Sequence, residues 1–278
     1  ADVEKLRFAV FSCSNFPDGH FNGYGMAVQD QVDYVLHLGD FIYEYNAPEP
    51  AIAGRPIVLP SGKNRMVSRE DLDYVYSTYR SDKNLRLLLE QHTMMHISDD
   101  HEIANNRYYD YSEQRYHGDS GFPIDGDAEA TSKFFLEGMK AYYDWIPSRF
   151  AYNPRADHPF DVAEPYRRLR FGKLIDLFLI DGRWFRSKQG ALPGAENSDL
   201  TEAGQADGTM LGRKQLGWFL DGLVRSTTAW RFVANQTLFV PWGAVIPLRE
   251  GNVYLNTDAW DGYRADRAAV SAALKVAG

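Results

Sequence analysis

The sequence predicts a mixed α/β protein, in which short strands alternate with helices. Five short apolar runs have the length and composition of strands, and segments with helical spacing of apolar residues lie between them. The chain has 278 residues, 44% of them hydrophobic, which is enough for a sizeable core in one large domain or two small ones. No run of about 18 apolar residues occurs, so no transmembrane helix is expected.

Each predicted strand is rich in apolar or β-favouring residues and is followed by polar residues or glycine. This punctuation indicates where the strands end and where the loops of the sheet begin. In chain order, the predicted strands are Leu6–Ser12, Tyr34–Leu38, Thr93–Ser98, Leu174–Ile180 and Arg231–Phe239.

Helix start and stop signals lie between these strands. Ser68 is expected to cap a helix over residues 69–82, and Asn84–His92 continues as a second helix. Thr131 is expected to cap a helix that Pro147 ends. Two more helices are predicted from Leu and aromatic spacing, over residues 212–226 and Arg264–Val276.

The segment Asn105–Ala130 shows no clear period. Its length is typical of a functional loop, and equally of a solvated surface excursion. Asp125 and Asp127 within it could hold an ion, although two carboxylates alone do not define a site. Glycines in Asp18–Gly25 permit a tight turn into a helix, whose first amides could bind an anion or could serve the turn alone.

Charge and cysteine content narrow the function classes. The net charge of −8 argues against a general nucleic-acid or anionic-membrane surface. It leaves an anionic substrate open, because bound cations reverse the local field. With Cys13 as the single cysteine, no intrachain disulfide can form.

Chemically distinctive residues follow the first three predicted strands. Because ligands tend to bind beyond the carboxyl ends of strands in open α/β sheets, these residues are expected to converge on one edge. Each also has an ordinary explanation: a buried cysteine, a turn aspartate, or acids at a helix start. The residues are Cys13 after the first strand, Asp40 and Tyr43 after the second, and Asp99, Asp100, His101, Glu102, Asn105 and Asn106 after the third.

A thiolate, a phenolate, carboxylates and an imidazole at one sheet edge form a mixed hard and soft ligand set. Such a set would suit a trivalent iron beside divalent cations with oxygen ligands. Asp40 at the mouth of an apolar strand carries a desolvation cost, which direct coordination would offset.

The sequence resembles the PhoD-like alkaline phosphatase and phosphodiesterase family, within the calcineurin-like metallophosphoesterases. The matching pieces follow the family order over nearly the whole chain: "FAVFSCSN", "VLHLGDFIYEY", "YRSDKNLRLLLEQHTMMHISDDHEIANN", "LFLIDGRWFR", "LGRKQLGWFLDGLVRSTTAWRFVANQT" and "DAWDGY". The resemblance implies a four-layer αββα sandwich with a metal cluster at the strand ends.

The resemblance also implies roles for particular residues. Cys13 and Tyr43 match ligands of an Fe3+ ion, and Tyr43 would give the protein a visible charge-transfer colour. Asp40 matches the carboxylate that bridges the metals, and Asp100 a ligand of a second metal, Ca2+ or another divalent ion. His101 would lie near the scissile phosphate. Asn105 and Asn106 are candidate substrate-binding residues, and Asp181 and Arg183 match a motif expected to give structural support.

By resemblance, the protein hydrolyses phosphate mono- or diesters with a metal-activated hydroxide. Phospholipids, with a phospholipase D-like activity, and phosphonate esters are other substrates that the resemblance allows. A secreted, periplasmic or cell-envelope location is expected on the same ground. The alternative is a metal-depleted, non-catalytic binding relative.

Three rival chemistries find less support in the residues. A cysteine-nucleophile phosphatase needs an arginine six residues after the cysteine, where this chain has Gly19. No Gly-x4-Gly-Lys-Ser/Thr loop indicates a nucleoside-triphosphate enzyme. A carboxylate-pair glycosidase would give Cys13 and Tyr43 no role.

The chain departs from the family pattern in two places. The family's C-terminal Gly-Asp-x-His metal motif is missing, and no histidine follows His158. The N-terminal β-sandwich domain that members often carry is also missing. We therefore expect residues 1–278 to form a catalytic domain that is incomplete at its C-terminus. Either the chain is a piece of a larger protein, completed by a further chain or fragment, or its metal site is incomplete. The first alternative is favoured, and residues 1–278 alone are expected to bind metal weakly and to be nearly inactive.

Overall fold

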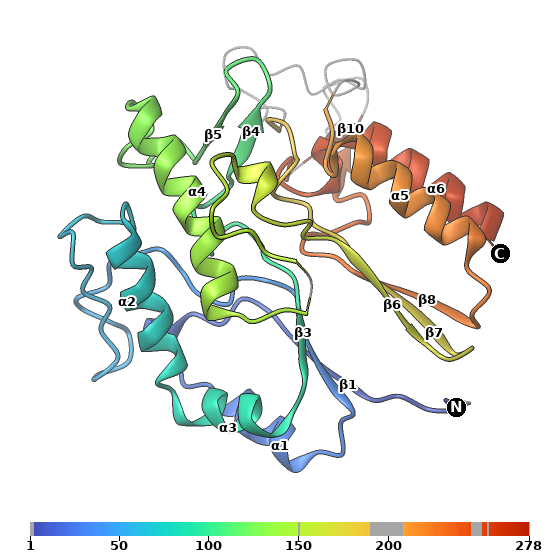
Figure 1. Cartoon of the computed structure of the whole chain (residues 1–278), viewed down its shortest axis with the longest axis horizontal. Coiled ribbons are helices and arrows are strands. Elements are labelled where there is room, and N and C mark those ends of the chain that lie inside the picture. Colours follow the sequence, from blue (N-terminus) through green and yellow to red (C-terminus); the bar gives the residue numbers. More distant parts are fainter. Residues whose placement is uncertain (1–2, 150, 190–207, 246–251, 255, 278) are drawn as a thin grey trace. The chain divides into compact units, whose positions relative to one another are not determined.

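The computed structural model describes residues 3–149, 151–189, 208–245, 252–254 and 256–277. It divides into two compact units, each with helices and β-strands (Figure 1). The N-terminal unit comprises Val3–Arg107 and Arg115–Pro165, and the C-terminal unit comprises Tyr108–Gln114 and Tyr166–Gly278. The mixed α/β class predicted from the sequence is confirmed. The four-layer sandwich remains a prediction.

A three-stranded parallel sheet organises the N-terminal unit, with β2 (Tyr34–His37) between β1 (Phe8–Phe11) and β3 (Met94–His96). Phe11 pairs with His37 and His37 pairs with His96, so the three strands end level with one another. Parallel strands place their carboxyl ends at one edge, so the loops after all three strands start together. The three strands are each shorter than predicted, because the ladder pairing ends at Phe11, His37 and His96 and the residues after these belong to the loops.

Four helices belong to this unit. Figure 1 shows α2 and α4 side by side, and α1 lies against α3. The Ser68 hydroxyl accepts a hydrogen bond from the Asp71 amide at 3.1 Å, which confirms the predicted cap of α2. Asp82 caps α3 in the same way. The helices are α1 (Asn22–Gln29), α2 (Arg69–Arg80), α3 (Lys83–Gln91) and α4 (Ala128–Trp145), with short 3-10 turns η1 (Phe16–Asp18) and η2 (Pro159–Asp161) and the strand β5 (Arg115–His117).

The prediction that Thr131 caps a helix is wrong. Asp127 caps α4, since its carboxylate accepts hydrogen bonds from the amides of Glu129 and Ala130. Thr131 lies inside the helix, where its buried hydroxyl donates to the Ile124 carbonyl at 2.6 Å. Asp127 is better placed because it meets the free amides one turn earlier. Its role as a cap also accounts for one of the two carboxylates in "DGD".

The C-terminal unit is built on a second three-stranded sheet, in which β7 (Ile175–Leu179) lies between antiparallel β6 (Arg167–Phe171) and parallel β8 (Trp230–Ala234). All five residues of β7 are buried. The strand β6 was not predicted, because three arginines in "RRLRF" hide its apolar character. The other elements are α5 (Gly212–Arg225), α6 (Arg264–Ala277), η4 (Trp260–Gly262) and the short strands β4 (Tyr108–Asp110), β9 (Gly243–Val245) and β10 (Asn252–Tyr254).

An apolar core joins the helices of this unit to β7. Phe178 of β7 packs against the ring of Phe219 of α5, and both belong to one buried cluster with Leu223 of α5 and Val270 of α6. Figure 1 shows α5 and α6 lying alongside each other. The predicted Leu and aromatic stripe of α5 is thus core, as helical spacing of apolar residues usually indicates. None of the helices in the described ranges is both long and apolar enough to cross a bilayer.

Candidate metal centre

The loops that follow β1 and β2 are tied together at their first residues. The Cys13 amide donates to the Gly39 carbonyl at 3.2 Å, and the Ser14 amide donates to the Asp40 carbonyl at 3.3 Å. These bonds continue the pairing of the two strands past their ends. The side chains of Cys13 and Asp40 therefore emerge from adjacent turns.

Both turns need backbone conformations that most residues avoid. Cys13 and Asp40 have φ angles of 56° and 53°, in the left-handed region where a side chain is strained. Gly39 has a φ of 105°, and a Cβ there would lie 2.5 Å from the Cβ and amide nitrogen of Asp99. The glycine before Asp40 is thus required by the close approach of the loop after β3.

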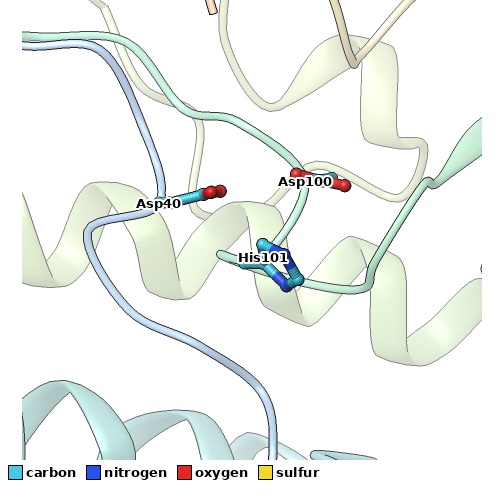
Figure 2. Close-up of side chains that lie close together, drawn as sticks. All are labelled: Asp40, Asp100 and His101. Carbon is cyan, nitrogen blue, oxygen red and sulfur yellow. The ribbon is translucent and has the colours of Figure 1, made fainter. Parts of the chain in front are cut away.

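Asp40, Asp100 and His101 place their ligand atoms within 4.8 Å of one another. Figure 2 shows Asp40 reaching from its loop toward the loop that carries Asp100 and His101. Asp40 and Asp100 are buried, and His101 is partly buried. Oxygen and nitrogen donors at such distances can share one cation.

Tyr43 and Cys13 adjoin these three residues. The Tyr43 hydroxyl donates to the Asp40 carboxylate at 3.1 Å, and its ring centroid lies 4.3 Å from that of His101. The Cys13 thiol interacts with both the Asp40 carboxylate and the Tyr43 hydroxyl. The arrangement brings together all five residues predicted as metal ligands or catalytic groups.

The electrostatics of the cluster suit a bound cation. Burial and the neighbouring carboxylates raise the pKa of Asp40 to about 8, and burial raises the pKa of the Cys13 thiol to about 11. Burial and the Asp40 carboxylate hold the pKa of Tyr43 well above its usual range. The buried Oδ1 atom of Asp40 has no hydrogen-bond partner. A cation would stabilise the ionised form of all three groups and would give this oxygen a partner.

Two further acids hold the cluster in place, and sequence reasoning gave neither a role. Glu44 is fully buried and accepts hydrogen bonds from His101 Nδ1 at 2.7 Å and from the Asn105 amide at 2.9 Å. Glu102, also fully buried, accepts from the amides of Phe41 and Asp99 at 2.7 and 2.8 Å. The position of Glu44 as an acid within the apolar run "FIYEY" is the sequence feature that indicates a buried carboxylate with a specific role.

The contact of His101 with Glu44 determines its protonation. Burial alone would lower the pKa of His101, but the hydrogen bond to Glu44 and the nearby carboxylates raise it to about 10. Since Nδ1 contacts Glu44, the Nε2 atom is the one left to face a ligand.

Asn105 and Asn106, the predicted substrate-binding residues, both make hydrogen bonds within the N-terminal unit. The Asn105 side-chain amide donates to Asp119 at 2.7 Å, and Asp119 forms an ion pair with Arg65. The Asn106 backbone amide donates to Asp100 Oδ2 at 2.7 Å, from a left-handed conformation with φ of 53°. Both residues therefore brace the loop after β3 in this structure.

Asp181 and Arg183 lie in the C-terminal unit. The Asp181 carboxylate accepts from the amides of Arg183 and Trp184 at 3.0 and 2.7 Å. Arg183 makes two hydrogen bonds to the Asp258 carboxylate, at 2.8 and 2.9 Å, and Arg186 lies 2.7 Å from the same carboxylate. These buried contacts are consistent with the structural support expected of the motif.

The chain is a mixed α/β protein with acidic, thiol and phenol groups gathered at strand ends, where they could hold a metal ion. The family model described as "PhoD-like phosphatase" matches residues 8–278, so the chain belongs to the PhoD-like phosphatase family. The resemblance seen in the sequence motifs is thereby confirmed.

Two known proteins show the same relationship. The chain is 27% identical over 270 residues to "Alkaline phosphatase D" of Bacillus subtilis (strain 168), and the match covers 96% of this chain and 42% of that protein. The solved structure titled "Structure of PhoD" has a TM-score of 0.81 and 27% identity, over 100% of this chain and 50% of that one. The chain thus spans about half the length of these relatives.

Proposed function

We propose that the protein takes part in metal-dependent hydrolysis of phosphate mono- or diesters. The observation that carries this proposal is the meeting of Cys13, Tyr43, Asp100 and His101 at the Asp40 carboxylate, whose buried Oδ1 atom has no hydrogen-bond partner. Family membership and the similarity to an alkaline phosphatase support the same reaction class.

The donor set would suit two cations that prefer different ligands. Cys13, Tyr43 and Asp40 offer a thiolate, a phenolate and a carboxylate, which suit Fe3+. Asp40 and Asp100 offer oxygen atoms to a second cation, Ca2+ or another divalent ion. When bound, such cations lower the pKa of water and neutralise charge on the phosphoryl oxygens.

His101 is the residue we assign to proton transfer. Its Nε2 atom would donate to the leaving oxygen of the ester or to the developing charge on phosphorus-bound oxygens. Glu44 holds the ring through Nδ1 and favours the protonated form that this role needs. Asn105 and Asn106 would contact substrate only after leaving their present hydrogen bonds, so we assign them first to positioning the loop.

The finer assignments are part of the same proposal. They include a diesterase or phospholipase D-like activity and a secreted or cell-envelope location. Residues 1–278 would supply the catalytic domain for these activities. Asp40 and Asp100 alone do not distinguish a monoester from a diester, because the groups that would contact the second ester substituent lie outside this cluster.

Metal content, colour and hydrolysis test the proposal together. The longest form of the protein that can be prepared is loaded with iron and calcium, and is assayed on nitrophenyl phosphate and on a nitrophenyl diester. We expect a visible absorption band that Tyr43→Phe removes, and hydrolysis that Cys13→Ser and Asp40→Asn each reduce by about a hundredfold or more. Tyr45→Phe, which removes a phenol with no contact to Asp40 among the hydrogen bonds described, is the matched control for colour.

The result that would refute the proposal is a well-folded long form that takes up neither metal and hydrolyses neither ester. That outcome would favour the alternative of a non-catalytic binding relative. A band that persists in Tyr43→Phe would refute the assignment of Tyr43 alone.

A further inference from the structure

A cavity of about 510 Å³ opens in the N-terminal unit beside the candidate metal centre. Cys13 and Tyr43 belong both to its lining and to the metal centre, so the two spaces adjoin. The rest of the lining comes from the end of β1, the turn η1 and the start of α1. Its volume lies in the range of about 300–1,000 Å³ that is typical of small-molecule sites.

We propose that this cavity, the alcohol pocket, holds an alcohol substituent of the phosphoester, and that Asp18 makes it select uncharged or cationic substituents over anionic ones. The first part rests on the proposed function, because an ester whose phosphorus lies at the metal centre must extend into an adjoining space. The second part concerns the charge of the pocket and stands on its own residues.

Hydrogen bonds fix the Asp18 carboxylate at the pocket. Its Oδ2 atom accepts from the side-chain amide of Asn15 at 2.7 Å, and its own amide donates to the Asn15 carbonyl at 3.3 Å. The orientation of the Asn15 side chain is set from the other side, where the buried Tyr79 hydroxyl donates to Asn15 Oδ1 at 2.8 Å. Asp18 is therefore a built feature of the wall, although it is exposed to solvent.

The turn that carries Asp18 is clamped from behind by Arg55. The guanidinium group of Arg55 lies 3.6 Å from the centre of the Phe16 ring, and its Nε atom donates to the Phe16 carbonyl at 2.7 Å. Arg55 is in turn paired with Asp82 at 2.9 Å, so its charge is already balanced. Arg55 therefore does not neutralise the negative charge of Asp18, and this charge faces the pocket.

The remaining groups of the lining do not cancel this charge. The start of α1 contributes amides worth about half an elementary charge at most, which is less than the full charge of Asp18. The other titratable side chains of the lining outside the metal centre are His20 and Tyr24, and burial raises the pKa of Tyr24 to about 12, so its phenol stays neutral. Phe21 and Tyr24 supply apolar surface, which suits methyl and methylene groups. A neutral or ammonium-bearing alcohol fits this lining better than a carboxylate- or phosphate-bearing one.

Cys13 provides a direct probe of the pocket, because it is the only cysteine and lines the cavity. The residue is exposed, so a reagent in solution can reach it. Two methanethiosulfonates of similar size, one with a trimethylammonium group and one with a sulfonate group, are reacted with the metal-free protein. Each forms a mixed disulfide with Cys13 and releases methanesulfinate. The ratio of the two rates cancels the thiolate population and reports the local charge.

Asp18→Asn removes the charge and keeps an oxygen that can accept from Asn15. We expect it to lower the cation-to-anion rate ratio by about threefold or more at low ionic strength, with a smaller effect at high salt. Asp30→Asn, an exposed acid at the end of α1 that does not line the pocket, is the matched control and should leave the ratio unchanged. Circular dichroism and urea unfolding show whether both variants remain folded.

A second measurement links the charge to substrate. The metal-loaded long form is assayed on two nitrophenyl phosphodiesters, one of choline and one of a carboxylate-bearing alcohol of similar length. Asp18→Asn should reduce the preference in kcat/KM for the choline ester by about threefold or more. The proposal that Asp18 selects substituents by charge would be overturned if Asp18→Asn leaves the cation-to-anion rate ratio of Cys13 unchanged. It would also be overturned if Asp30→Asn changes this ratio as much as Asp18→Asn does. A changed ratio without hydrolysis of any ester would instead refute the proposed function and the assignment to an alcohol.

Discussion

Replacing Asp258 by Asn should destabilise the C-terminal unit severely. Its carboxylate makes two hydrogen bonds to Arg183 and lies 2.7 Å from Arg186, and the side chains of these arginines are 3% and 0% exposed. Removing one partner of a buried ion pair costs about 3–5 kcal/mol. The neutral amide of Asn keeps one acceptor oxygen but directs an NH2 group at a guanidinium donor, so we expect about 3 kcal/mol.

Urea unfolding followed by tryptophan fluorescence measures this change. Trp184 and Trp260 are almost fully buried in the same unit and report its unfolding. Asp221→Asn is the matched control, because Asp221 pairs with Arg225 on the surface of α5, where both side chains are more than half exposed. An exposed pair of this kind contributes about 0–1 kcal/mol. If the two variants unfold within 0.5 kcal/mol of each other, on the order of the surface-pair contribution, the reasoning about the buried cluster is refuted.

The same cluster makes a prediction about pH. Burial alone would raise the pKa of Asp258, but Arg183 and Arg186 hold it well below its usual range. A carboxyl whose pKa is lowered by folding contributes stability above its unfolded pKa of about 3.9 and loses it as the pH falls toward the folded value. The difference between wild type and Asp258→Asn should therefore shrink below about pH 4, and a difference that grows there would contradict the sign.

Three further outcomes follow from the N-terminal unit. Glu44→Gln should lower the pKa of His101 in the metal-free protein from about 10 to below about 9, because a hydrogen bond to a charged acceptor is lost. NMR titration of the ring measures this pKa, and an unchanged value would show that other carboxylates keep His101 protonated. Gly39→Ala should lower the free energy of unfolding by about 3 kcal/mol or more, because the added Cβ would overlap Asp99. Gly62 also has a positive φ, of 67°, but has open space around it, so Gly62→Ala should lower the free energy of unfolding by only about 1 kcal/mol. Equal losses would refute the steric argument. Ser68→Ala should cost about 1 kcal/mol in urea unfolding through the lost cap of α2, and no loss would mean that the cap is dispensable.

The sequence predicts the strands and their ends best where an apolar run is followed directly by glycine or charged residues. Strands that are apolar and end in Gly-Asp or Asp-Asp-His lie where they are predicted. Asp40 and His101 meet, with Cys13 beside Asp40, because the parallel strands end level. That convergence follows from topology, which the alternation of strands and helices indicates. The roles of these residues in binding metal remain predictions.

Features that depend on long-range partners were not predictable in the same way. The acid in the apolar run "FIYEY" marks Glu44 as unusual, but no local pattern identifies the backbone amides and His101 as the partners of Glu44 and Glu102. Three arginines hide the apolar character of β6, and their partners lie elsewhere in the sequence, as Asp176 does for Arg168. Thr131 and Asp127 are both good caps by residue type, and only the position of the first free amide decides between them.

The parallel pairing of β1, β2 and β3 has a consequence for how the protein matures. Each neighbouring pair is separated by a helix or more of intervening chain, so the sheet closes through distant contacts that form slowly compared with the helices. Cys13 and Asp40 hold strained left-handed conformations that only the assembled neighbours can impose. A nascent or partly unfolded chain would therefore present no preorganised cradle, and ion capture should come after sheet assembly rather than guide it.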